Sequence, residues 1–221
     1  MKNPRDKSVG SNAELFLIKD EIEYEASETF GILMPTGVDL DLPVVGGFGQ
    51  KYSLQVGTIY GGGFGQPPDA ITMYRKHSNM MVPNDLEIDM QAEVVPPLFD
   101  FELDKSTAPR WTIKWRTGDG NSNGDAIFGS LEWYENNEEH NWLIHMPPDR
   151  QGAWQLPAMP ERFAQFRAAS MDPSMPARII LMSASFIDGY SDYTANHGPD
   201  LFEKMPPPEA EISASFAGNE F

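Results

Sequence analysis

The segment from Thr117 to Asp125 (TGDGNSNGD) holds the side chains best suited to chemistry, because carboxylates and amides alternate along it. Oxygen atoms at every second position can turn inward onto one hard cation, and Gly124 permits the sharp bend that such a loop needs. Asn-Gly is also a strong hairpin signal. Two interpretations therefore stay open: an ordinary hairpin loop, or a metal site whose ligands are Asp119, Asn121, Asn123 and Asp125.

The stretch from Asp119 to Gly124 matches the opening half of the pattern D-x-[DN]-x-[DN]-G. It resembles the calcium loops of EF-hands and of some β-rich extracellular proteins, which implies calcium as the cofactor. The resemblance is short, and Ser130 stands where an EF-hand has its bidentate glutamate. The flanking segments also read as strands rather than helices.

No other arrangement of residues points to catalysis. The chain has no cysteine, no Gly-x-Ser-x-Gly elbow and no His-Glu-x-x-His motif. His140 and His145 are five residues apart, so on one strand they face opposite ways and cannot bind one metal together. Carboxylates around Asn136-Asn137 could supply a glycosidase pair, although the two asparagines indicate a solvated turn. We predict a protein that is not an enzyme, with a hydrolase as the open alternative.

All five tryptophans fall between Trp111 and Trp154. Trp111, Ile113 and Trp115 alternate along one segment, and Trp142, Ile144 and Met146 along another, so both stripes are predicted to face a core. Trp133 and Trp154 are the predicted exposed members. Exposed aromatic side chains on a β-surface can stack on sugar rings or anchor a protein interface.

Carboxylates alternate with apolar residues in three segments, and this rhythm predicts the fold class. The longest runs from Asp85 to Val94, and shorter ones occupy 21–26 and 99–104. Side chains on a strand point alternately to opposite faces, so each run describes a strand with one apolar and one acidic side. We predict an all-β fold, a two-sheet antiparallel sandwich or jelly-roll. Strands are expected at about 13–18, 21–26, 29–34, 52–60, 70–76, 85–94, 99–104, 111–116, 126–134, 141–146, 178–187 and 210–216.

The runs 85–94 and 99–104 would place like charges opposite one another if they paired, which is destabilising. Pro96-Pro97 could send the second strand to the other sheet. Alternatively, Lys114 and Arg116, on the next strand with Thr112, could neutralise part of the acidic row. A third possibility is that a basic partner or a metal ion covers the row. Its candidate contact residues are then Glu87, Asp89 and Glu93.

The organisation expected from the sequence is a single domain with an arm at each end. Residues 1–12 read as a polar N-terminal arm, 13–204 as the β-sandwich domain, and 205–221 as a Pro-rich C-terminal arm with a terminal strand. The only segment with a helical pattern is 160–169, where proline suits the first turn. We therefore predict one short inserted helix near 160–169.

The charge balance excludes several partner classes. The chain carries 33 Asp and Glu against 16 Lys and Arg, for a net charge of −17. Such a surface repels nucleic acid and anionic membranes, so neither is an expected partner. No apolar run is long enough for a signal peptide or a membrane span, and the expected location is the cytoplasm or an assembled particle.

These features favour a non-catalytic structural or assembly protein, such as a virion or other large-particle component. Its expected partners are other protein chains, in a homo-oligomer or a larger assembly, contacted through acidic strand faces and terminal arms. Two alternatives stay open. One is a calcium-assisted carbohydrate-binding module that uses the loop and the exposed tryptophans. The other is an acidic inhibitor or immunity-type protein that masks a basic partner surface.

Overall fold

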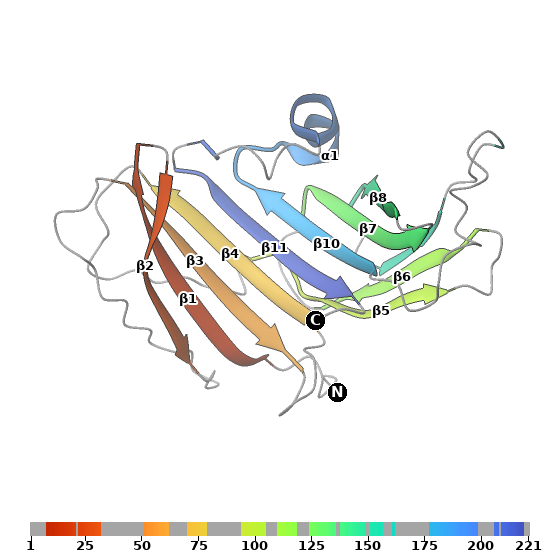
Figure 1. Cartoon of the computed structure of the whole chain (residues 1–221), viewed down its shortest axis with the longest axis horizontal. Helices are drawn as coiled ribbons and strands as arrows, with labels where there is room; N and C mark the ends of the chain where they lie inside the picture. Colours follow the sequence, from red (N-terminus) through yellow and green to blue (C-terminus); the bar gives the residue numbers. More distant parts are fainter. Residues whose placement is uncertain are drawn as a thin grey trace.

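Two antiparallel sheets make up the computed structural model of the chain (Figure 1). The larger sheet has eight strands in the order β2-β1-β3-β4-β11-β10-β7-β8, and the smaller has three in the order β5-β6-β9. This confirms the predicted all-β, two-sheet architecture. The strands are β1 (Ser8–Lys19), β2 (Ile22–Gly31), β3 (Lys51–Tyr60), β4 (Ala70–Ser78), β5 (Leu98–Asp104), β6 (Thr112–Thr117), β7 (Ala126–Glu135), β8 (Glu138–Met146), β9 (Gln151–Gln155), β10 (Ala177–Ala184) and β11 (Glu211–Gly218).

The structure describes residues 8–20, 22–31, 51–61, 70–78, 94–104, 110–118, 124–135, 138–148, 151–156, 161, 177–198, 206–207 and 209–218. The predicted strand at 85–94 lies outside this part of the chain, apart from Val94. The predicted helix at 160–169 lies outside it apart from Glu161. The two strands expected at 21–26 and 29–34 run as one strand, β2, with a bulge in its pairing to β1.

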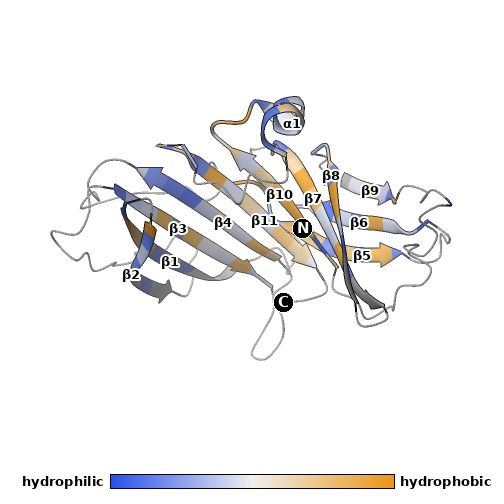
Figure 2. Ribbon diagram, turned by 45° about the horizontal axis from the view of Figure 1, so that its top comes forward, coloured by the Kyte–Doolittle hydropathy of each residue, from blue (hydrophilic) through white to orange (hydrophobic). Residues whose placement is uncertain are grey.

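The main core lies between the two sheets. The inner face of the large sheet contributes Ile127, Ile179 and Leu181, and the small sheet contributes Ile113 and two tryptophans. Ile113 and Ile179 are fully buried, as alternation on β6 and β10 requires. In Figure 2, orange apolar stretches are visible on β5, β7 and β10, which contribute buried residues to this core.

The segment from Val94 to Leu98 joins the sheets and is buried along its length. It crosses β11, where the hydroxyl of Ser213 accepts a hydrogen bond from the Val95 N–H at 3.3 Å. The hydroxyl of Ser215 accepts one from the Leu98 N–H at 2.7 Å. Because buried backbone N–H groups need acceptors, these two serines allow an irregular segment to lie on the sheet.

A short helical segment covers the outer face of β7 and β10. It consists of α1 (Gly189–Asp192) followed by a π-turn (Tyr193–His197). Tyr193 is fully buried in a second core with Phe128 and Met182. This helix lies in the connection from β10 to β11, and the sequence reading did not anticipate it. No helix among the described residues is both long and apolar enough to span a membrane.

Both terminal segments contribute strands to the large sheet. β1 starts at Ser8, so the last residues of the expected N-terminal arm belong to a strand. The predicted terminal strand is present as β11, and it lies in the interior of the sheet between β4 and β10. The last described strand therefore joins the two halves of the large sheet.

Candidate functional site

Asp125 is the one predicted metal ligand within the described part of the chain; Asp119, Asn121 and Asn123 lie outside it. Its Oδ2 accepts hydrogen bonds from the Ser183 hydroxyl at 2.9 Å and the Ala184 N–H at 2.8 Å. Its own N–H donates to the Met182 carbonyl at 2.7 Å. This carboxylate therefore ties the start of β7 to β10. Within the residues that the structure describes, no group of three or more acidic or histidine side chains is placed to hold a metal.

The tryptophans serve mainly as core residues. Trp111 and Trp115 are 5% and 7% exposed, which confirms the prediction for the first stripe. Met146 of the second stripe is buried, and Trp142 packs against the main core with Ile144. Trp154, expected on an exposed surface, also packs against that core and is only partly exposed, because it lies opposite Ile113 in the β6–β9 pairing.

Trp133 and His140 lie opposite each other on β7 and β8, and their side chains are outside the described set. His145, in the same uninterrupted pairing, lies opposite Phe128. The backbone pairing of β8 with β7 runs without a register shift between the two histidines.

The acidic row of β5 is neutralised by β6. Lys114 Nζ lies 2.6 Å from Asp104 Oδ2 and 3.8 Å from a Glu102 carboxylate oxygen. Arg116 Nε lies 2.7 Å from Asp100 Oδ2. The hydrogen bond to Asp104 raises the pKa of Lys114. The predicted neutralisation by Lys114 and Arg116 is thus confirmed, whereas Glu87, Asp89 and Glu93 lie outside the described residues.

A polar network on the outer face of β1 to β4 escaped the sequence reading. Arg75 Nη2 forms an ion pair with Glu23 Oε2, and Arg75 Nε donates a 2.8 Å hydrogen bond to the Ser53 hydroxyl. The Arg75 guanidinium also lies over the Phe16 ring, 5.4 Å from its centroid. Because Glu23 is on β2 and Arg75 on β4, the ion pair links the outermost strand to the interior of the sheet.

His77 belongs to the same network and is 4% exposed. Its Nδ1 lies 3.9 Å from Glu23 Oε1, and its Nε2 is buried with no hydrogen-bond partner among the residues that the structure describes. Burial lowers the pKa of His77 and nearby Arg75 lowers it further, against an opposing effect from Glu23. No local pattern predicted this arrangement, because alternation along a strand identifies the residues on one face but not the other strands that share that face.

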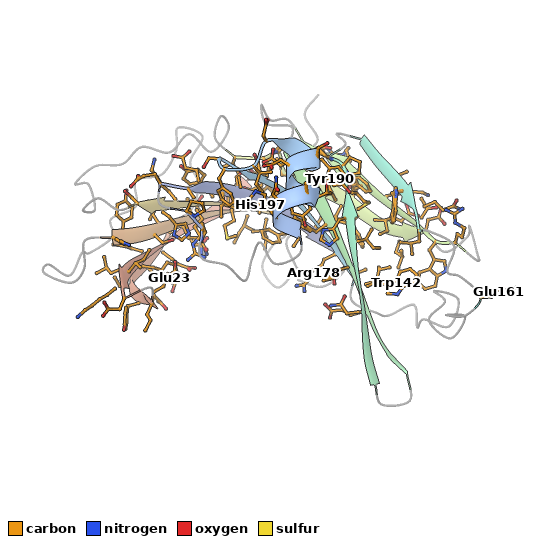
Figure 3. The ribbon with its side chains drawn as sticks, turned by 90° about the horizontal axis from the view of Figure 1, so that it is seen from above. Glu23, Trp142, Glu161, Arg178, Tyr190 and His197 are labelled. Carbon is orange, nitrogen blue, oxygen red and sulfur yellow. The ribbon has the colours of Figure 1, made fainter. Side chains whose placement is uncertain are left out.

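The short helix is held to β8 by an aromatic cluster. The Tyr193 hydroxyl lies 2.6 Å from His145 Nδ1, and the Tyr190 hydroxyl donates to the His145 carbonyl at 3.1 Å. Phe128 packs edge-on against both His145 and Tyr193. Burial raises the pKa of Tyr193 and lowers that of His145, so both groups are neutral at pH 7. Figure 3 shows Tyr190 and His197 on this helix above the sheet.

The exposed large apolar side chains of the described residues lie on the two outermost strands of the eight-stranded sheet. Ile22 and Tyr24 on β2 are 54% and 42% exposed, and Leu143 on β8 is 61% exposed. Outermost strands are the usual places where a sheet pairs with another chain.

No protein-family model, no curated protein and no solved structure matches this chain. A functional proposal must therefore come from its own residues.

Proposed function

We propose that this protein is a non-catalytic structural or assembly protein, such as a component of a virion or another large particle. In this role it contacts neighbouring protein chains in the cytoplasm or within the assembled particle. The observation that carries the proposal is the position of the exposed apolar side chains, Ile22, Tyr24 and Leu143, on the two outermost strands.

The composition of these strands supports the proposal. Each is paired on one side only among the described strands. Natural sheets protect such edges with lysine or proline, and neither residue occurs in β2 or β8. Both strands carry glutamates instead. Their negative charge would favour positively charged partners, and their backbone N–H and C=O groups can still form a ladder with another strand.

Light scattering tests the proposal most directly. The wild-type chain is expected to form multimers, and these should grow with added salt because salt screens the repulsion between chains of charge −17. Leu143→Lys and Ile22→Lys should each lower the mass, because a lysine on an outermost strand opposes pairing with another chain.

Ala195→Lys is the matched control. Ala195 is exposed on the helical segment rather than on either outermost strand, and this variant adds the same charge. Its mass should equal that of the wild type. A monomeric mass at every concentration and salt level would overturn self-assembly, as would an equal effect of the control variant.

A further inference from the structure

The β7–β8 hairpin continues past the strand that supports it. β10 pairs with β7 only as far as Leu131, which lies opposite Ala177. β8 pairs with β7 further, from Glu132–Asn141 to Glu135–Glu138. We call residues 132–135 and 138–141 the β7–β8 ribbon. Figure 3 shows these two strands running on together away from the sheets.

A two-stranded ribbon is marginally stable alone, because it lacks the third strand or packing layer that independent hairpins need. Among the described strands, none pairs with either side of the β7–β8 ribbon. A binding partner that supplied such a layer would therefore stabilise it.

The charge of the β7–β8 ribbon indicates what kind of partner that would be. It carries four glutamates, and Glu135 lies directly opposite Glu138, where like charges oppose pairing. The ion pair that the structure gives here is from Arg178 Nη2 to Glu132 Oε1, at 3.3 Å. Arg178 is itself largely exposed, so the pair is a weak one.

We infer that the β7–β8 ribbon docks on a positively charged surface of a partner protein, with Leu143 as an apolar contact at its base. Lysine or arginine side chains on that surface would relieve the repulsion among the glutamates and favour encounter at long range. A second copy of this chain fits the β7–β8 ribbon poorly, because it carries the same charge of −17. The self-contacts proposed above would instead use the exposed apolar side chains of the outermost strands. The inference rests on the proposed function, since its partner is another protein chain.

A defined cationic probe tests the inference. A fluorescently labelled peptide of alternating lysine and valine can form an extended strand and carries only positive charge. Fluorescence anisotropy should show that it binds the full chain and that its affinity falls as salt is added. Glu138→Lys with Glu139→Lys should weaken binding by about tenfold, as expected from replacing two attractions with two repulsions.

Glu25→Lys with Glu28→Lys is the charge-matched control. Both residues are exposed on β2, at the opposite side of the sheet, and the net charge changes equally. This control should weaken binding by less than about threefold, the long-range effect of net charge alone. The double variant Glu138→Gln with Glu139→Gln removes the two negative charges without adding positive ones, and it should bind the peptide with an intermediate affinity. It controls for loss of binding through misfolding, because glutamine keeps nearly the shape of glutamate.

Equal losses in the ribbon and control variants would overturn the inference, because binding would then follow net charge. Affinity independent of salt would overturn it as well. A monomer that still binds the peptide through the β7–β8 ribbon would end self-assembly and leave this inference standing. Multimers whose peptide binding does not depend on the β7–β8 ribbon would support self-assembly and overturn this inference.

Discussion

At the scale of single residues, the Glu23 carboxylate receives two basic side chains from β4. Arg75 contacts Oε2 directly, whereas His77 Nδ1 is 3.9 Å from Oε1. The Arg75 guanidinium pairs with the carboxylate and also repels a proton on His77. Burial acts in the same direction. His77 is therefore a neutral, buried histidine in the folded protein.

The pH dependence of stability follows from this. The pKa of His77 in the folded state is below its ordinary value of 6.5, so the unfolded chain binds more protons as pH falls through 6.5. The free energy of unfolding should therefore decrease between about pH 7 and pH 5. Urea titrations at several pH values measure the slope. His77→Gln should flatten it, and adding His145→Gln should flatten it further; an unchanged slope in both would contradict the assignment.

Asp100 provides a second test at this scale. The φ angle of Asp100 is +54°, in the left-handed region, which is unfavourable for residues that have a Cβ atom. Asp100 also lies where the β5–β6 pairing shifts register. Asp100→Val should destabilise the protein by about 1–2 kcal/mol more than Asp100→Asn. Both variants lose the charge paired with Arg116, but asparagine tolerates left-handed φ. Equal urea midpoints for the two would show that the backbone conformation is not the cause.

At the scale of elements, β9 makes one unusually close contact with β6. Gly152 lies opposite Trp115 in the β6–β9 pairing, and a Cβ at this position would overlap the indole ring. Because Gly152 has no side chain, the Trp115 ring can lie directly over the backbone of β9 and shield it at this position. The contact adds to the backbone pairing with β6 and to the packing of Trp154 against the core, which also hold this five-residue strand.

Gly152→Ala should therefore force Trp115 out of place and destabilise the protein by about 1–3 kcal/mol. Tryptophan fluorescence should change in the folded state, and urea unfolding measures the loss of stability. Ala153→Ser, at the exposed neighbouring position, should stay within about 0.5 kcal/mol of the wild type. Wild-type fluorescence and stability in Gly152→Ala would contradict the contact.

At the scale of the whole molecule, β11 holds the large sheet together. It pairs with β4 from Glu211 to Phe216 and with β10 from Ile212 to Gly218. Without it, the strands β2-β1-β3-β4 and β10-β7-β8 lose the ladder that joins them. These pairings join strands that are far apart in sequence. Folding that depends on them is slow, because the entropy of closing a long loop is lost before the contacts between the strands form.

Deleting residues 209–221 should therefore abolish cooperative unfolding and the near-ultraviolet circular dichroism that reports fixed aromatic packing. A synthetic peptide of residues 209–221 added in trans should restore that signal, because it supplies the missing strand between β4 and β10. A scrambled peptide of the same composition should not. A truncated chain that unfolds cooperatively would show that the two halves are stable apart.

Several features were accessible from local pattern. Trp111, Ile113 and Trp115 alternate from the residue before β6 into that strand, and both tryptophans are buried as predicted. The pairing of β5 carboxylates with β6 bases followed from the same period of two. By contrast, β9 and α1 were missed, because β9 is only five residues long and α1 only four, too short to show a period.

The amino-acid sequence by itself indicated most of the longer strands and the apolar side of β6, because both depend on neighbours along the chain. Only the tertiary structure decided that β11 lies between β4 and β10, that Glu23 meets Arg75 and His77, and that β8 is outermost. These features depend on which strands pair and in which register. That choice is settled by contacts between residues far apart in sequence, which a local pattern does not record.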